Sequence, residues 1–290
     1  MPKASGPKKA LTTSHRALAI WGTSSGAGKS LITTALARWY QRQGLKVMPF
    51  KAQNMSNHVA IIDGGEMGVA QWLQALAANQ TPRVEMNPVL SKPRPDGTSQ
   101  VVLLGQLSEK LTQLPWRERA SQVWDTVRKA ADGLAEEADL LLVEGAGSPA
   151  EINLADVDLA NLAIARHLNA PALLISDIDR GGAFAHIYGT WSLLPREHRA
   201  RIKGFVMNGF RGDASLLAPG PQRLGQLTGV DSVAVMPWLA HELPEEDSAG
   251  KQRKTPGENG ATDLEATFEL LADAVEEHLD LDLLRRFGGL

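Results

Sequence analysis

The 290-residue chain contains no cysteine. Without thiols it cannot form a disulfide, a thiolate zinc site or a cysteine nucleophile. Its seven histidines show no H-x-x-x-H or similar spacing, which argues against a zinc site built from histidine. The formal net charge is −3, so the composition lacks the basic excess of a nucleic-acid-binding protein. We therefore expect neither a zinc ion nor a nucleic-acid partner.

The sequence also lacks long apolar runs. None approaches the roughly 20 residues that a membrane-spanning helix needs. The first 16 residues include Lys3, Lys8, Lys9 and Arg16 but no apolar core, so they do not resemble a secretory signal. We interpret residues 1–16 as a disordered basic tail, and we expect a cytoplasmic protein with no membrane partner.

The most informative stretch that is present runs from Ala17 to Ser30. An apolar strand leads into a Gly-rich turn that ends in Gly-Lys-Ser, and a run compatible with a helix follows at residues 31–43. This order is typical of a phosphate-binding loop, the P-loop. A strict pattern needs glycine at position 23, where this chain has Thr23. The alternative is an ordinary glycine turn, but both flanks favour a site for ATP or a similar nucleotide.

The loop residues have distinct expected roles. Glycine lets the backbone curl and approach a ligand closely, and the N–H groups at the start of a helix bind phosphate. Lys29 is expected to reach the β- and γ-phosphates, and the Ser30 hydroxyl is expected to ligate Mg²⁺. The predicted nucleotide-binding residues are Gly26, Ala27, Gly28, Lys29 and Ser30.

Apolar runs alternate with helical patterns along the chain. We expect strands at residues 18–21, 46–50, 100–104, 140–143, 172–176, 204–207 and 232–235. We expect helices at 31–43, 66–78, 116–137, 159–167 and 183–194. Most of the strands are continuously apolar, as in parallel sheets buried on both faces. The prediction is an α/β fold of the P-loop NTPase type, with a doubly wound, mostly parallel sheet and helices on both faces.

The domain organisation follows from a change in composition. Residues 17–241 are predicted to form the nucleotide-binding domain. Residues 242–262 are polar and rich in Gly, Pro, Lys and Glu, which indicates a linker. Residues 263–290 show apolar positions at helical spacing, which predicts one amphipathic helix that packs on its own domain or on a partner.

Polar residues follow several of the expected strands, where open α/β sheets bind their ligands. Lys51 is expected to face a transferred phosphoryl group, the alternative being a surface lysine. Glu144 comes directly after a buried strand and is expected to hold Mg²⁺. Glu66 is a second candidate metal ligand at an expected helix start, where capping is the alternative. Asp158, and the carboxylates near Arg180, are either site residues or structural caps.

Ordered blocks of sequence resemble a known family, the cobyric acid synthases, in their amidating domain, which is related to dethiobiotin synthetase. The resemblance covers about residues 17–248. Its blocks are Gly22-Thr23 with Gly26-Ala27-Gly28-Lys29-Ser30, Phe50-Lys51-Ala52-Gln53-Asn54-Met55, Gly64-Gly65-Glu66 with Ala70-Gln71, Met86-Asn87-Pro88-Val89-Leu90 with Lys92-Pro93, Val143 to Leu154, Asp177-Ile178-Asp179-Arg180-Gly181-Gly182, Lys203 to Asn208, Phe210-Arg211-Gly212-Asp213, and Leu243-Pro244 with Glu246-Asp247-Ser248.

The resemblance implies a ligase of cobalamin biosynthesis. Its substrate would be a corrinoid, adenosylcobyrinic acid a,c-diamide, whose peripheral carboxylates are amidated through acyl phosphates to give cobyric acid. ATP and Mg²⁺ would be its cofactors. The resemblance also implies catalytic roles for Lys29, Lys51 and Asp158. Substrate-binding roles are implied for Gln53, Asn54, Asn161, Asp179 and Arg180.

The chain departs from the family in two ways. Ser25 stands where the family usually has an acidic residue. Members usually carry a second, glutaminase-like domain, whereas residues 263–290 supply only one helical segment, and no cysteine is present to attack glutamine. We therefore expect ammonia itself, or a separate glutaminase subunit, as the nitrogen source, and a homodimer is possible. The alternatives are a carboxylate kinase or ligase acting on another acid, and a non-enzymatic nucleotide switch.

Overall fold

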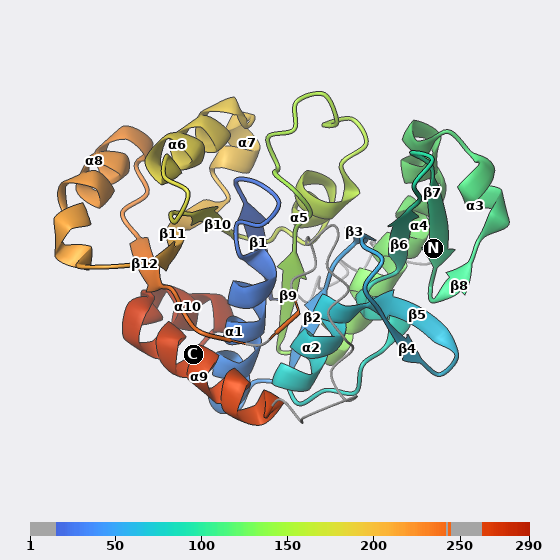
Figure 1. Ribbon diagram of the computed structural model, residues 1–290, viewed down its shortest axis with the longest axis horizontal. Helices are drawn as coiled ribbons and strands as arrows, with labels where there is room; N and C mark the ends of the chain where they lie inside the picture. Colours follow the sequence, from blue (N-terminus) through green and yellow to red (C-terminus); the bar gives the residue numbers. More distant parts are fainter. Residues whose placement is uncertain (1–15, 242, 245–262) are drawn as a thin grey trace, which may run out of the picture.

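The computed structural model describes residues 16–241, 243–244 and 263–290. Its centre is a six-stranded sheet in the order β12-β11-β10-β1-β9-β2, and every neighbouring pair is parallel. This confirms the predicted P-loop fold class (Figure 1). The strands are β1 (Ala17–Gly22), β2 (Val47–Phe50), β9 (Leu140–Glu144), β10 (Ala172–Asp177), β11 (Ile202–Phe210) and β12 (Val233–Pro237).

Helices cover both faces of this sheet, because alternate strand residues point to opposite sides. Leu18 and Ile20 pack in one apolar cluster with Leu36, whereas Ala19 and Trp21 pack in the other. The first face is covered by α1 (Lys29–Arg42), α2 (Val69–Ala77), α9 (Leu264–His278) and α10 (Leu281–Gly288). The second is covered by α4 (Trp116–Glu137), α5 (Ile164–His167), α6 (Ala183–Leu193) and α8 (Pro219–Thr228).

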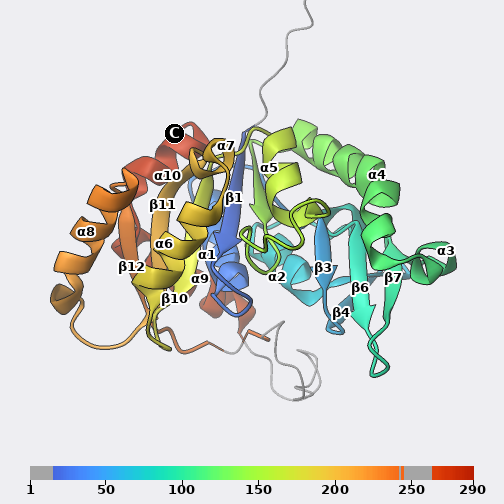
Figure 2. The same ribbon diagram turned by 90° about the horizontal axis from the view of Figure 1, so that it is seen from above.

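A second, smaller sheet lies beside the first (Figure 2). Its order is β3-β6-β7-β8, from β3 (Gln53–Met55), β6 (Val89–Pro93), β7 (Ser99–Leu103) and β8 (Gln106–Leu107). The strand expected at 100–104 is therefore real, but its place in the parallel sheet was wrong. β7 runs antiparallel to β6. A turn closed by Arg94 N–H donating to the Thr98 carbonyl joins them, and so short a connection permits only antiparallel pairing.

A β-hairpin replaces the start of one predicted helix. β4 (Val59–Ile62) and β5 (Gly65–Gly68) pair antiparallel through Asp63 and Gly64, both with positive φ. Asp-Gly is a strong signal for this two-residue turn. Glu66 consequently lies in β5, and α2 begins at Val69 rather than at residue 66. The expected capping position of Glu66 was therefore wrong.

The C-terminal segment forms two helices rather than the one that was predicted. α9 ends at His278, and Asp280 caps α10 by accepting a hydrogen bond from Leu283 N–H. Phe268 is buried, and Glu269 pairs with Arg38 of α1 at 2.8 Å. The segment thus packs on its own domain. The predicted tail lies outside the described residues apart from Arg16, and so does the linker apart from Leu243 and Pro244.

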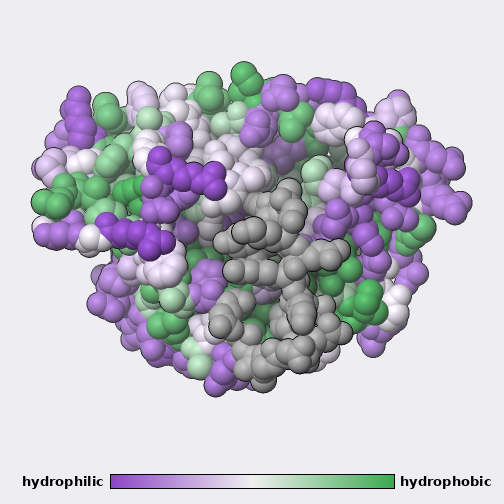
Figure 3. Space-filling view, viewed as in Figure 1, coloured by the Kyte–Doolittle hydropathy of each residue, from purple (hydrophilic) through white to green (hydrophobic). Residues whose placement is uncertain are grey.

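The remaining elements are short. They are η1 (Val84–Met86), α3 (Glu109–Gln113), η2 (Leu159–Ala163), which is π-helical, α7 (Arg196–Arg199) and η3 (Ala214–Leu217). Hydrophilic and apolar residues are interspersed over the described part of the face in Figure 3. No helix within the described ranges has both the length and the apolar character required to cross a bilayer.

Candidate nucleotide and phosphoryl-transfer site

The phosphate-binding loop joins β1 to α1 at the carboxyl edge of the sheet. Gly26 and Gly28 have φ of 72° and 94°, which disfavour any residue with a side chain. A Cβ on Gly28 would also lie 2.0 Å from the Asn208 amide nitrogen. α1 begins directly at Lys29, so the backbone N–H groups of its first turn lie next to the loop, where they can bind the phosphate groups of a nucleotide.

Lys29 is held inside this loop. Its side chain is buried, and Nζ donates to the carbonyls of Ser24 at 2.9 Å and Gly147 at 3.1 Å. A Cβ on Gly22 would lie 3.0 Å from the Lys29 side chain, so glycine leaves room for it. Thr23, which departs from the strict pattern, donates its N–H to the Ile175 carbonyl of β10 at 2.8 Å. This position therefore anchors the loop to the sheet.

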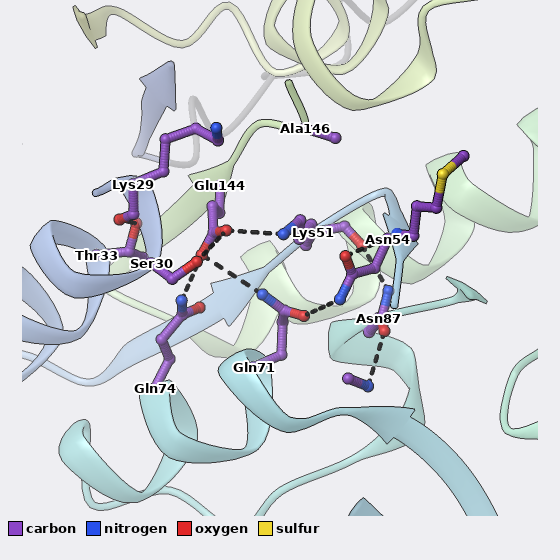
Figure 4. Close-up of polar contacts among 12 residues, drawn as sticks. Lys29, Ser30, Thr33, Lys51, Asn54, Gln71, Gln74, Asn87, Glu144 and Ala146 are labelled. Atoms are coloured by element: carbon purple, nitrogen blue, oxygen red, sulfur yellow. Dashed lines mark hydrogen bonds and ion pairs between the residues drawn. The ribbon is translucent and has the colours of Figure 1, made fainter. Parts of the chain in front are cut away.

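Glu144, the last residue of β9, is the centre of the site (Figure 4). It is fully buried, and its Oε1 accepts hydrogen bonds from Lys51 Nζ and Ser30 Oγ, each at 2.8 Å. Sheet order explains the encounter, because β9 lies between β1 and β2 and the three strands end at one edge. The interpretation of Lys51 as a surface lysine is wrong, since only 4% of it is exposed.

The protonation of Glu144 depends on these neighbours. Burial by itself would raise the pKa of the carboxyl, but the Lys51 ammonium and the hydrogen bonds from Gln74 and Ser30 outweigh it. The net result is a pKa below the usual value, so Glu144 is a carboxylate at neutral pH. The Ser30 hydroxyl and a carboxylate are hard oxygen donors, and such pairs suit Mg²⁺ together with phosphate oxygens and water.

Amide side chains surround this ion pair. Gln74 Nε2 donates to Glu144 Oε2 at 2.5 Å, and Gln71 Nε2 approaches the same atom at 3.5 Å. Asn54 Nδ2 donates to Gln71 Oε1 at 3.3 Å. Asn87 Nδ2 donates to the Lys51 carbonyl at 3.3 Å, and its Oδ1 accepts from the N–H of the residue before α2. This amide cluster, Asn54, Gln71, Gln74 and Asn87, is buried.

Asp158 and Asn161 lie beyond the loop that follows β9. Asp158 accepts from the N–H groups of Asn161 at 2.9 Å and Leu162 at 3.1 Å, which makes it the cap of η2. Burial raises the pKa of Asp158, although these N–H groups oppose the rise. Asn161 Nδ2 donates to the Ala146 carbonyl at 2.8 Å, so its side chain reaches the loop directly after Glu144.

Other predicted residues lie in different surroundings. Glu66 pairs with Lys92 Nζ at 2.9 Å, and both side chains are partly exposed. Asp179 and Arg180 follow β10 at the same edge of the sheet as the loop. Asp179 pairs there with Arg211 at 3.3 Å, and the Arg180 side chain is 87% exposed. Among the described residues no group of three or more His, Asp or Glu is arranged to hold a metal ion.

Gln53 lies in β3, where it helps to line a small cavity with Trp116 and Val157. The sequence alone assigned no role to Gln74, and it offered Gln71 and Asn87 only within blocks of resemblance. The sequence did contain a signal for Gln71 and Gln74, because they are two amide side chains in an otherwise apolar helix, α2.

The sequence of this chain is similar to those of known proteins over most of its length. The chain is 59% identical over 239 residues to a cobyric acid synthase from Variovorax paradoxus, covering 82% of this chain and 50% of that protein. It is 55% identical over 251 residues to a cobyric acid synthase from a Polaromonas species, covering 86% and 50%. The chain thus spans about half the length of the curated relatives it matches.

Among solved structures, the cell division ATPase MinD of Pyrococcus furiosus is 17% identical, with a TM-score of 0.42 and coverage of 91% of this chain and 99% of that one. The family model described as the CobQ/CobB/MinD/ParA nucleotide binding domain matches residues 18–250, which include the phosphate-binding loop and, apart from Ala17 at the start of β1, all six strands of the central sheet. The chain belongs to this family of nucleotide-binding domains.

Proposed function

We propose that this chain catalyses the ATP-dependent amidation of corrinoid carboxylates, converting adenosylcobyrinic acid a,c-diamide toward cobyric acid. The similarity to cobyric acid synthases supports the reaction class. The observation that carries the proposal is the meeting of Ser30, Lys51 and Glu144 beside the phosphate-binding loop. A nucleotide, a divalent cation and a phosphoryl group all require such charges at one point.

The chemistry follows from the weakness of a carboxylate as an electrophile. Its oxygen attacks the γ-phosphorus of ATP, the bond to the bridging oxygen breaks, and ADP leaves. Ammonia then attacks the acyl carbon, loses a proton and expels inorganic phosphate. In this scheme Lys29 and the loop N–H groups bind the phosphates, and Lys51 stabilises the transferred phosphoryl group.

Ser30 and Glu144 are the residues that would hold Mg²⁺, which would neutralise phosphate charge when bound. Glu66 is the weaker candidate, because its carboxylate is paired with Lys92. Gln53, Asn54, Asn161, Asp179 and Arg180 are proposed to contact the corrinoid. Asp158 is proposed to act on substrate or intermediate. Its hydrogen bond from Asn161, whose side chain reaches the Ala146 carbonyl in the loop after Glu144, supports this assignment.

The test is mass spectrometry of a corrinoid a,c-diamide incubated with the chain, ATP, Mg²⁺ and ammonium. Each amidation replaces OH by NH₂, and ADP should accumulate in step with the amide. ATP hydrolysis at a rate that does not depend on the corrinoid would favour the nucleotide switch. Phosphorylation of another acid without amide formation would favour the carboxylate kinase.

We further propose that these 290 residues use ammonium rather than glutamine. Releasing ammonia from an unactivated amide requires its own nucleophile, commonly a cysteine thiolate, and the chain has no cysteine. The assay compares the two donors at neutral pH, with and without an added glutaminase. Efficient amidation from glutamine by the chain alone would contradict this proposal.

A further inference from the structure

Two glutamine side chains approach the free oxygen of the central carboxylate. Gln71 and Gln74 are three residues apart on α2, so they project from the same face of the helix. Ser30 and Lys51 both bind Oε1 of Glu144, whereas the glutamine amides approach Oε2. Both ends of the carboxylate are therefore held by donors from different elements.

We propose that Gln74, supported by Gln71, is a positioning residue that orients Glu144 for its metal and phosphate partners. The inference rests on the proposed function, in which Ser30 and Glu144 would hold Mg²⁺, and Oε1 is the Glu144 oxygen that faces Ser30. The last torsion of a glutamate side chain has a broad energy profile, so a carboxylate bound at one oxygen can swing. A donor on Oε2 stops this rotation and keeps Oε1 facing Ser30.

The surroundings of Gln74 indicate that its amide serves Glu144. The side chain is fully buried, and its Oε1 has no hydrogen-bond partner among the described residues. An apolar side chain of equal size would fill this space without burying an unpaired carbonyl. The polar contact of Gln74 with Glu144 is thus the reason for an amide at this position.

Gln71 is fixed by its own neighbours. Asn54 Nδ2 donates to its Oε1, which leaves the Gln71 Nε2 directed at Glu144. Gly68 makes this packing possible, because a Cβ there would lie 2.4 Å from Asn54 Nδ2 and 2.9 Å from Gln71 Oε1. Gly68 has φ of −62° and ψ of 136°, which any residue can adopt. Alanine at this position would therefore disturb the amides without straining the backbone.

The first experiment uses Gln74→Met, which keeps the volume and removes the amide. Mn²⁺ binding is titrated by electron paramagnetic resonance in the presence of saturating ADP. Loss of a residue that orients a metal ligand typically weakens metal affinity about 10–100-fold, and we expect a loss in this range. ADP affinity measured in EDTA and the melting temperature should stay close to those of the parent. Gln80→Met, just beyond α2, is the matched control.

The second experiment uses Gly68→Ala, which tests the same cluster even if Gln74→Met fails to fold. It should also weaken Mn²⁺ binding, whereas Gly133→Ala in α4, where a Cβ meets no atom within 4 Å, should not. Unchanged Mn²⁺ affinity in folded Gln74→Met or Gly68→Ala would overturn the positioning role. An equal loss of ADP affinity in EDTA would also overturn it, because the effect would then be general.

Neither titration needs a corrinoid, which separates this inference from the proposed reaction. Weakened Mn²⁺ binding in the variants, combined with no amidation by the parent, would reject the reaction and retain the positioning role. Amidation by the parent with unaltered Mn²⁺ binding in the variants would support the reaction and reject the positioning role. A parent protein that binds no Mn²⁺ with ADP would overturn the positioning role, whatever the amidation assay shows.

Discussion

Two lysines at the site are buried to a similar extent but contact different groups. Lys29 is 6% exposed and donates to the backbone carbonyls of Ser24 and Gly147. Lys51 is 4% exposed and pairs with the carboxylate of Glu144. Removing the first leaves neutral carbonyls behind, whereas removing the second leaves a buried charge without its partner. The comparison suggests a hypothesis: two similarly buried lysines can have different roles when their contacts differ. The following experiments test this hypothesis.

The largest effect is expected for Lys51→Met. Breaking a buried ion pair from one side costs about 3–5 kcal/mol, because the remaining charge is uncompensated. The free energy of unfolding, measured with denaturant, should fall by this amount. The double variant Lys51→Met with Glu144→Gln should recover much of the loss, since it removes both charges. Full stability in the single variant would contradict the importance of this pair.

Lys29→Ala should leave the fold intact and impair turnover. Removing a preorganised electrostatic contact typically lowers the rate on the order of 10²–10³-fold. Amide formation and ADP release are the measurements, and Lys110→Ala on the exposed surface of α3 is the control. Turnover within tenfold of the parent would remove the loop lysine from the proposed mechanism. A large drop in melting temperature would instead assign Lys29 a role in stability.

Two variants of Asp158 can distinguish a helix-capping role from a catalytic role. Asp158→Ala removes the cap of η2 and should cost about 1 kcal/mol of unfolding free energy. Asp158→Asn should keep the cap, because asparagine is an equally good capping residue. We expect the asparagine variant to retain stability and to lose turnover, as the proposed role requires. Normal turnover in that variant would assign the residue to capping alone.

The smallest effect is expected for Glu66→Gln. Its ion pair with Lys92 is partly exposed to solvent, and such pairs contribute about 0–1 kcal/mol to stability. We also expect little change in Mn²⁺ affinity in the presence of ADP, because Lys92 already holds the carboxylate. A tenfold weaker Mn²⁺ affinity would identify Glu66 as a metal ligand and extend the site beyond Ser30 and Glu144.

Several features could be predicted because they are local in the chain. The phosphate-binding loop needs only the succession of strand, glycines, Lys29 and helix. Six of the seven expected strands lie in the central sheet, since strands buried on both faces are continuously apolar. The hairpin around Asp63 and Gly64 was missed although its turn signal was present. The small sheet was missed because its strands are short and pair with partners that periodicity does not reveal.

The sequence by itself determined the fold class, the phosphate-binding loop and the position of Glu144 at a strand end. Only the tertiary structure decided which groups surround that carboxylate. Lys51 and Ser30 are 93 and 114 residues away along the chain, and they reach it because β9 lies between β1 and β2. Gln74 reaches it because α2 starts only after a hairpin. Such contacts depend on strand order and helix boundaries, which no short stretch of sequence encodes.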